Sequence, residues 1–378
     1  MQKPAEMSYT LLIVSPEPWE TNQVSKHHYA RTLAKRGHRV LFLDPPRPAC
    51  SALSIDKVKG EAGEILLVRG PRVAPGLRFM PRFLRRSLER SWLQRLEGLA
   101  GVHIDIVWLF ENSRFYDMSF AGDRLKIYHQ VDLNQDRHLA VAATSADISF
   151  AVSDIILAQI SRYSTNVWKI PHGVLEVASE ASGDWPWIRP GRIAAACVGN
   201  LDITYLDAEI CREVVCGLPE VDFHFIGSYS EATELHQALR AMPNAFFWGR
   251  LSSADLSGVL KMMDVTMIVY DTIHHRDQVA NPHKLMEYLA SGKVTVATFM
   301  DEYTSLADGL IVMVDQPADY PAAFRAVVAD LVRWNSPELR AARIAFALDN
   351  TYDRQLDRIS LALAGCDWIR DRLGEIRL

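Results

Sequence analysis

The sequence predicts an α/β protein made of two doubly wound parallel-sheet domains. Short apolar runs alternate with segments of helical periodicity along the chain, and this alternation is typical of parallel sheets covered by helices. It breaks once, at 176–190, where Ser, Gly, Asp, Trp and Pro accumulate, and then restarts. A chain of 378 residues has room for two domains of ordinary size. We therefore expect an N-terminal domain at 1–175 and a C-terminal domain at 190–350.

The first series runs from residue 9 to about residue 170. Gly37 ends its first helix, Pro45 and Pro46 stop the strand that follows, and Ser153 is placed to cap a helix that starts at Asp154. Strands are expected at 9–14, 38–43, 65–68, 104–110, 125–128, 148–152 and 168–170, and helices at 24–35, at 82–99 and after 153.

The second series repeats this plan. Strands are expected at 193–198, 223–226, 245–248, 265–270, 294–298 and 310–314, and helices at 206–216, 231–241 and 253–263. Gly199, Gly227 and Gly249 each end a strand. A tight turn into the next helix explains each glycine at least as well as the close approach of a substrate does.

Composition narrows the class of protein. At 49% hydrophobic and 23% charged residues the chain is globular, and its net charge of −5 gives no support for a nucleic-acid partner. Its five cysteines form no Cys-x-x-Cys pair, so we expect reduced thiols and no metal site. No apolar run reaches the roughly 18 residues of a membrane span, and the N-terminus does not resemble a signal peptide. We expect a cytoplasmic protein.

Three common nucleotide or hydrolase motifs are absent. The first strand is followed by Ser15-Pro16-Glu17-Pro18-Trp19 and not by Gly-x-Gly-x-x-Gly, which counts against a dehydrogenase. The chain has no Gly-x-x-x-x-Gly-Lys-Ser loop, so a P-loop enzyme is disfavoured. It has no Gly-x-Ser-x-Gly elbow, which disfavours the usual hydrolases.

The stretch 281–293 carries the strongest functional pattern. Pro282 opens a short helix and Gly292 closes it, directly before a buried strand. Lys284 and Glu287 lie one turn apart and share one helix face. A helix N-terminus with a lysine in its first turn is suited to bind a diphosphate, and the carboxylate is placed to hold a sugar or ribose hydroxyl. A surface ion pair explains the same spacing.

Polar residues follow the strand expected at 125–128. Asp132 stands at the carboxyl end of this strand, where ligands bind in parallel sheets and where a catalytic base would lie. His129, in the same loop, would contact a phosphate or a sugar. The alternative is structural, with Asp132 or Asp136 as a helix cap and His129 as a core residue whose hydrogen bonds are satisfied.

An arginine-rich segment covers 69–95, with eight arginines against one acid, Glu89. Helical spacing predicts an apolar stripe through Leu84, Leu88, Trp92, Leu96 and Leu99, with Arg82, Arg85, Arg86 and Arg90 on the other face. Such a face can lie on anionic lipid, and a solvated helix face is the alternative. The apolar run at 76–81 favours the membrane.

Together these stretches resemble glycosyltransferases of the GT-B type, which have two Rossmann-like domains facing an interdomain cleft. The chain is similar to the large glycosyltransferase family 4, with matching stretches at 152–153, 170–174, 197–200, 218–227, 244–250 and 281–298. Their order agrees over roughly residues 10–365. The chain also resembles the membrane-associated glucuronosyltransferase of xanthan assembly, whose acceptor side matches Glu111 and the segment around Asp132.

The resemblance implies a donor site in the C-terminal domain for a UDP- or GDP-linked sugar. Lys284 would bind the diphosphate and Glu287 would lie near the ribose or the sugar. The other donor-side positions are Gly199, Asn200, Gly227, Arg250, Tyr270, Arg276 in the loop before this helix, Asn281, His283 and Leu285. Asp132 matches the family's base, and the final helices, at 351–378, would cross back onto the N-terminal domain. Neither a cofactor nor a metal is expected.

The chain departs from the family pattern at three positions. Family 4 enzymes usually have a second Glu eight residues before the position of Glu287, and Val279 stands there. Asn200 and Tyr205 occupy positions where the family usually has basic residues. Diphosphate binding then depends on Lys284, with help from Arg250 or Arg276.

The expected function is transfer of a sugar from a nucleotide diphosphate sugar to a lipid-linked saccharide, in cell-surface polysaccharide biosynthesis at the inner membrane face. Two alternatives stay open. A nucleotide-sugar epimerase of the same fold would turn over its substrate without an acceptor. A catalytically silent partner subunit would bind no nucleoside diphosphate, and Val279 and Asn200 suggest it.

Overall fold

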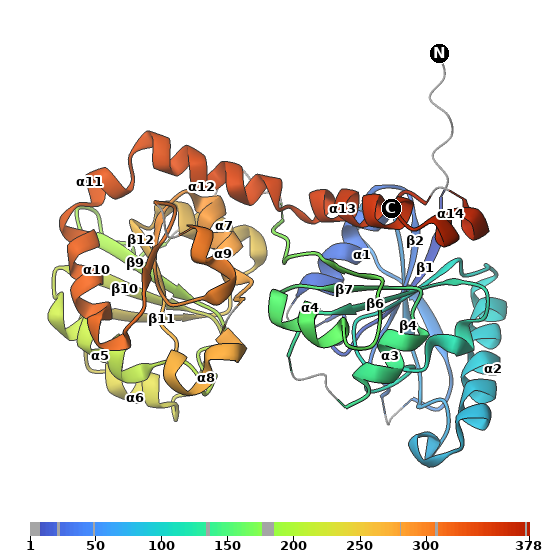
Figure 1. Cartoon of the computed structure of the whole chain (residues 1–378). Coiled ribbons are helices and arrows are strands. Elements are labelled where there is room, and N and C mark those ends of the chain that lie inside the picture. Colours follow the sequence, from blue (N-terminus) through green and yellow to red (C-terminus); the bar gives the residue numbers. More distant parts are fainter. Residues whose placement is uncertain are drawn as a thin grey trace. The chain divides into compact units, whose positions relative to one another are not determined.

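The computed structural model divides the chain into two compact units, each built around a mainly parallel sheet (Figure 1). It describes residues 8–20, 23–47, 50–133, 137–175, 185–279, 281–306, 309–374 and 376–378. The first unit comprises the chain up to His172 together with Tyr352–Leu378, and the second comprises Gly173–Thr351.

The sheet of the first unit has the strand order β3-β4-β2-β1-β5-β6-β7-β8. All neighbouring strands pair in parallel except β3 and β4, which are antiparallel. The strands are β1 (Thr10–Val14), β2 (Arg39–Leu43), β3 (Ser54–Lys57), β4 (Glu64–Arg69), β5 (Ile106–Leu109), β6 (Leu125–Gln130), β7 (Ile148–Ala151) and β8 (Val167–Lys169).

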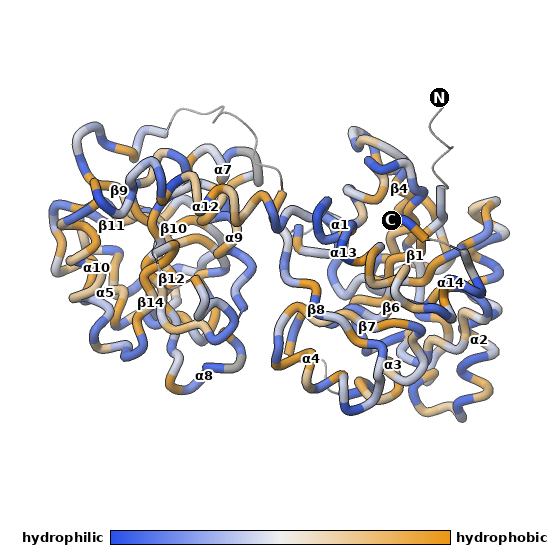
Figure 2. Tube along the Cα trace, turned by 45° about the horizontal axis from the view of Figure 1, so that its top comes forward, coloured by the Kyte–Doolittle hydropathy of each residue, from blue (hydrophilic) through white to orange (hydrophobic). Residues whose placement is uncertain are grey.

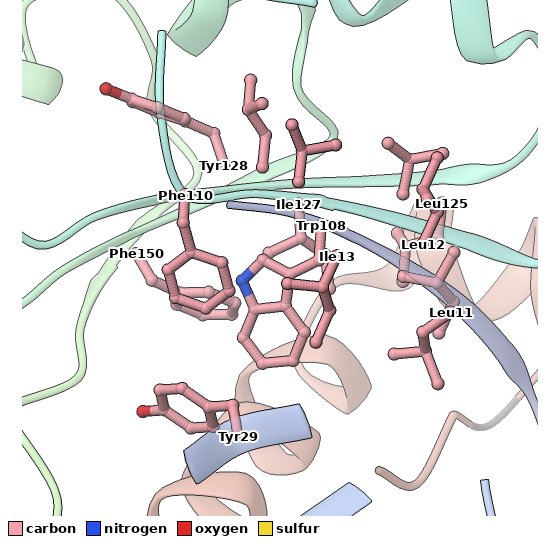
Figure 3. Packing of buried hydrophobic residues seen from close by; sticks show 14 of the residues in the cluster. Leu11, Leu12, Ile13, Tyr29, Trp108, Phe110, Leu125, Ile127, Tyr128 and Phe150 are labelled. Atoms are coloured by element: carbon pink, nitrogen blue, oxygen red, sulfur yellow. The ribbon is translucent and has the colours of Figure 1, made fainter. Parts of the chain in front are cut away.

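Helices cover this sheet and bury a core rich in aromatic rings. They are α1 (Ser25–Lys35), η1 (Leu77–Phe79), α2 (Arg82–Ala100), η2 (Met118–Ala121), α3 (Leu139–Ser145), α4 (Asp154–Ile160), α13 (Tyr352–Ala364) and α14 (Asp367–Leu373). Figure 3 shows Trp108, Phe110 and Phe150 on the sheet face that Tyr29 of α1 covers. Arg36, directly after α1, donates hydrogen bonds to Asp353 and Asp357 of α13, so the last helices belong to this unit.

The sheet of the second unit is entirely parallel, in the order β11-β10-β9-β12-β13-β14. Its strands carry mostly apolar residues, drawn in orange in Figure 2, because both faces of the sheet are covered, and β10 also buries Asp222 and His224. They are β9 (Ile193–Val198), β10 (Val221–Ile226), β11 (Ala245–Gly249), β12 (Val265–Ile268), β13 (Val294–Thr298) and β14 (Val312–Val314).

The helices of the second unit follow its strands in the alternating pattern. They are α5 (Ala208–Gly217), α6 (Glu234–Leu239), α7 (Ser253–Met262), α8 (Thr272–Val279), α9 (Lys284–Ser291), η3 (Asp301–Leu306), η4 (Pro317–Asp319), α10 (Tyr320–Ala329), α11 (Leu331–Trp334) and α12 (Pro337–Asp349). Helix α9 ends at Gly292, which takes the left-handed conformation with φ 76°.

The structure confirms the predicted alternation and corrects several elements. The edge strand β3 and the short helix α3 were not predicted, because neither has a long periodic run of its own. Arg276, expected in a loop, lies in helix α8. His129, also expected in a loop, belongs to strand β6, which continues to Gln130.

Candidate functional site

The chain order of the second sheet reverses at β9, which lies between β10 and β12. Ligands of such sheets bind outside the carboxyl ends of the strands where the order reverses. Here those ends carry Gly199 after β9, Gly227 after β10 and Tyr270 after β12. The sequence-predicted donor residues therefore include the loops at the reversal point of this sheet.

Three glycine turns lie next to one another at this end of the sheet. Gly199 donates its backbone N–H to Ile226, and Gly227 donates to Gly249, so the turns after β9, β10 and β11 are joined in series. Gly199 and Gly227 have φ of 140° and 143°, which side chains other than that of glycine rarely allow. A Cβ atom on Gly227 would stand 1.7 Å from the carbonyl oxygen of Gly199. Both glycines are required by this packing.

Lys284 lies against the first of these turns. It begins α9 and is buried, and a Cβ atom on Gly199 would stand 2.0 Å from its Nζ. The same Nζ lies 5.6 Å from the centroid of the Tyr270 ring. The structure thus brings together three predicted donor residues, Gly199, Tyr270 and Lys284.

Lys284 stays a cation in this buried position. Burial works to lower the pKa of its amine, but the nearby Tyr270, Cys197 and Tyr205 outweigh burial, and the net pKa is raised above its ordinary value. Burial also raises the pKa of the Cys197 thiol to about 11, against the effect of Lys284, so this neighbour is neutral at pH 7. A buried cation attracts anions strongly.

Glu287 lies one turn after Lys284 and is half-buried. Burial raises the pKa of its carboxyl to about 7, and Lys284 works against that rise. Near neutral pH this side chain therefore exists in both its protonated and its ionised form. In either form it can hydrogen-bond a hydroxyl group of a sugar or ribose.

Two tyrosines that sequence reasoning did not single out as functional hold this region. The Tyr288 hydroxyl accepts a 2.7 Å hydrogen bond from Val198 N–H and donates to the carbonyl of Met267, which fastens α9 to β9 and β12. Tyr205 packs edge-on against Tyr270 with ring centroids 5.3 Å apart. Lys284 and Tyr288 are four residues apart on one helix, and this spacing could have indicated from the sequence that Tyr288 lies on the same face as Lys284.

The other predicted donor residues have different surroundings. Asn200 accepts hydrogen bonds from Asp202 N–H and the Ser228 hydroxyl, and so joins the loops after β9 and β10. Asn281 accepts one from Tyr303 at 2.6 Å.

The remaining four predicted donor residues are Leu285, Arg250, His283 and Arg276. Leu285 is a core residue, while Arg250 and His283 are exposed. Arg276 forms a bidentate ion pair with Asp301, with distances of 2.8 and 2.9 Å, so its cation is already engaged.

In the first unit the two predicted catalytic residues differ sharply in exposure. Asp132 is exposed just beyond β6, and its backbone carbonyl accepts a hydrogen bond from Gln130. His129 is fully buried, with its ring 5.6 Å from that of Tyr29 and 5.1 Å from that of Phe110. Burial lowers the pKa of His129 to about 3, so the ring is neutral and, in this conformation, away from any substrate. Asp136 lies outside the described residues.

Glu111, predicted on the acceptor side, is buried and ion-paired with Arg114. Arg114 in turn donates to the carbonyl oxygens of Asp44 and Leu43, at 2.8 and 3.2 Å, and to that of Ser15. This guanidinium therefore fastens the carboxyl ends of β1 and β2, and Glu111 holds it in place.

The predicted orientation of α2 is wrong for part of its length. Arg85 and Glu89 face inward, where Arg85 contacts Asp117 and stacks 4.3 Å from the ring centroid of Tyr116. Leu84 and Leu88, expected on one apolar stripe with Trp92 and Leu96, are exposed, whereas Trp92 and Leu96 are buried. The carboxylate of Asp117, fully buried near η2, draws Arg85 inward, and nothing in the local periodicity of α2 reports this distant partner.

The described residues hold neither a cluster of metal ligands nor a membrane-spanning helix. No group of three or more His, Cys, Asp or Glu side chains within the described ranges is arranged to hold a metal ion. Among the helices of the described residues, none combines the length and the hydropathy needed to cross a membrane.

Comparison with known proteins gave matches only at the level of structure. No family model and no curated protein matches the sequence. Sucrose-phosphate synthase from Thermosynechococcus elongatus matches with a TM-score of 0.64 at 12% identity, over 93% of this chain and 98% of that one. A UDP-forming α,α-trehalose-phosphate synthase from Burkholderia xenovorans matches with a TM-score of 0.62 at 12% identity, over 95% and 99%. A glycosyltransferase from Rickettsia africae matches with a TM-score of 0.65 at 12% identity, over 98% and 100%.

These matches identify the fold class of the chain as GT-B, as predicted. The matched structures are glycosyltransferases of the GT-B type, and their similarity to this chain extends over both units. At 12% identity the similarity shows the fold alone. The finer resemblance to glycosyltransferase family 4 and to the xanthan glucuronosyltransferase is not confirmed by them and stays a prediction.

Proposed function

We propose that the chain is a glycosyltransferase that moves a hexosyl group from a nucleotide diphosphate sugar to a lipid-linked saccharide. The acceptor would belong to the biosynthesis of a cell-surface polysaccharide. The observation that carries the proposal is the buried cation of Lys284 at the N-terminus of α9, beside the glycine turn after β9.

The second unit would bind the donor through its diphosphate. Lys284 and the positive end of the α9 helix dipole supply positive charge at one point, and a diphosphate carries the matching negative charge. The absence of a side chain at Gly199 leaves the backbone open to close approach. Glu287 would hydrogen-bond the ribose or the transferred sugar, and Arg250, which is exposed after β11, is available to the base or the phosphates.

In the reaction, the bond between the anomeric carbon and the diphosphate oxygen breaks, and a bond from the same carbon to the acceptor oxygen forms. The bonding electrons leave with the nucleoside diphosphate, whose developing charge Lys284 would stabilise. This assignment needs no divalent metal. If the anomeric configuration inverts, Asp132 accepts the proton of the acceptor hydroxyl. If the configuration is retained, Asp132 positions the sugar. The buried His129 would then contribute only indirectly, by packing beneath the loop that carries Asp132.

The test is binding of nucleoside diphosphates and their sugars, measured by thermal shift and calorimetry. We expect UDP or GDP to raise the melting temperature of the wild type, and Lys284→Met to weaken that binding by at least about tenfold, since a charged hydrogen bond contributes roughly 1.5–3 kcal/mol. Lys261→Met, on α7 of the same unit, is the matched control.

The outcomes separate the alternatives. Equal affinity in Lys284→Met and wild type would contradict the donor site. Wild-type protein that binds no nucleoside diphosphate would favour the silent partner subunit. Turnover of a nucleotide sugar without an acceptor, into an epimeric nucleotide sugar, would favour the epimerase.

A further inference from the structure

The helix η1 and the first turns of α2 expose a cluster of apolar side chains. Phe79 is 78% exposed, Phe83 71%, Leu84 44% and Leu88 37%. The side of α2 that faces the core carries Arg85, Glu89, Trp92, Leu93 and Leu96 instead. These four exposed residues therefore do not contribute to the folded core, and their apolar area is left in water.

The exposed charged side chains of the segment 69–95 are all arginines. Arg78 and Arg86 are exposed and form no ion pair with any described residue. Arg82 and Arg90 are also exposed, although Arg82 reaches Asp117 and Arg90 donates to the carbonyl of Phe120. The one acid of the segment 69–95, Glu89, is turned inward and buried. We call this region, from Arg78 to Arg90, the α2 surface.

We propose that the α2 surface docks onto an anionic phospholipid membrane. Phe83 lies on the side of α2 opposite the core, with Arg86 and Arg90 along one flank and Leu84 and Leu88 along the other. In this arrangement the apolar side chains enter the boundary between headgroups and acyl chains while the guanidinium groups contact lipid phosphates.

The composition of the surface argues against other occupants. A second copy of the chain, docked symmetrically, would bring arginines against arginines. A nucleic-acid duplex would match the charge but would leave Phe79 and Phe83 in water, and a single strand that stacked on these rings would still leave Leu84 and Leu88 in water. Within the α2 surface, Arg78 lies 4.6 Å from the ring centroid of Phe79, so the two side chains already combine an apolar face and a cation.

This inference deepens the proposed function, because a lipid-linked acceptor is reached at a membrane. Its test needs neither donor nor acceptor. Purified full-length protein is floated with vesicles of phosphatidylcholine alone and of phosphatidylcholine with phosphatidylglycerol, at low and high salt. We expect binding only to the phosphatidylglycerol vesicles, and weaker binding at high salt.

The variant Phe83→Ser/Arg86→Glu should lower binding to the anionic vesicles by at least about tenfold, since it removes one anchor and reverses one charge worth about 1 kcal/mol. The matched control is Val332→Ser/Arg333→Glu on α11, where Val332 is 90% exposed. We expect this control to bind like the wild type. Both variants change exposed side chains, so their melting temperatures should stay within a few degrees of the wild type.

Several results would overturn the inference. The first is wild-type protein that does not bind anionic vesicles, and the second is an α2 variant that binds them as well as the wild type does. The third is a dimer or an RNA complex that Phe83→Ser/Arg86→Glu abolishes, formed by a wild type that does not bind vesicles. Failure here is distinguishable from failure of the proposed function. Lys284→Met should float like the wild type, and the α2 variant should still bind nucleoside diphosphates.

Discussion

The Nζ of Lys284 lies 2.0 Å from the point where a Cβ atom of residue 199 would stand, so Lys284 reaches the end of β9 only because that residue is glycine. The two residues are 85 positions apart in the sequence. The packing joins a strand end and a helix start at the place where the sheet order reverses. Any side chain at 199 must displace the amine.

Gly199→Ala should therefore weaken donor binding although Lys284 itself is unchanged. We expect nucleoside diphosphate affinity to fall at least about tenfold, because the new methyl group moves the cation and because φ of 140° is strained for alanine. Calorimetry with UDP and GDP measures this affinity. Gly191→Ala is the control, since Gly191 also has positive φ but has open space around its Cβ position. Similar losses in both variants would show that backbone strain alone is responsible.

Asp132→Asn should separate chemistry from donor binding. Removal of a general base lowers a rate by roughly 10²–10⁴-fold, while Asp132, in the first unit, has no part in the predicted donor site. Transfer of labelled sugar to a membrane extract should fall by this factor, with unchanged affinity for the nucleotide. Asp123→Asn, also exposed in the first unit, should leave transfer intact. Full activity of Asp132→Asn would exclude it as the base.

Arg343 should be essential to the stability of the second unit. It is fully buried, and it donates to the carbonyls of Leu310 at 2.7 Å, Trp334 at 2.8 Å and Gly292 at 3.2 Å. Burial lowers its pKa to about 10, so it is still a cation at pH 7. We expect Arg343→Met to cost about 2–5 kcal/mol in urea unfolding, because three carbonyls lose a donor.

Arg340→Met provides the comparison for that measurement. Arg340 is exposed on the same helix α12, and its loss should change stability by about 0.5 kcal/mol or less. If the two variants unfold alike, the buried hydrogen bonds of Arg343 contribute nothing specific.

Glu89 should make the protein less stable as the pH rises. Burial raises the pKa of its carboxyl to about 8, against the opposing effect of Arg85, while the ordinary value is 4.5. Between these values the folded state holds a proton that the unfolded state has released, so stability falls by about 1.4 kcal/mol per pH unit. The stability that protonated Glu89 contributes is fully present below pH 4.5 and is lost by about pH 8.

Glu89→Gln removes this titration. Relative to the wild type, its free energy of unfolding should rise steadily from pH 5 to about pH 8 and then level off. Urea unfolding at a series of pH values measures the difference. If the difference in unfolding free energy between Glu89→Gln and the wild type does not vary with pH, Glu89 is ionised in the folded state. Ser87→Ala, at an exposed position two residues earlier, controls for changes elsewhere in α2.

The α/β alternation was readable from the sequence because buried parallel strands are continuous apolar runs. The runs at β9 and β13 could be placed within a residue, and the Pro282 and Gly292 signals bounded α9 closely. Elements without such a run were missed: β3 is a mostly exposed edge strand, and α8 has polar residues on all sides.

The two faces of α2 show why periodicity failed there. Leucines at helical spacing predicted one apolar stripe opposite the arginines, but Asp117, 32 residues beyond Arg85, draws Arg85 inward. The helix is rotated accordingly, and Leu84 and Leu88 face outward. A partner so distant in sequence leaves no trace in the local pattern.

The sequence by itself determined the fold class, the strand–helix order and the segment around Lys284, because each depends on local apolar runs and on Pro and Gly at fixed offsets. Only the tertiary structure decided which of the candidates meet. It joined Lys284 to Gly199 and Tyr270, buried His129, and engaged Arg276 with Asp301. Such contacts depend on strand order and long-range packing, which residue spacing along one chain does not encode.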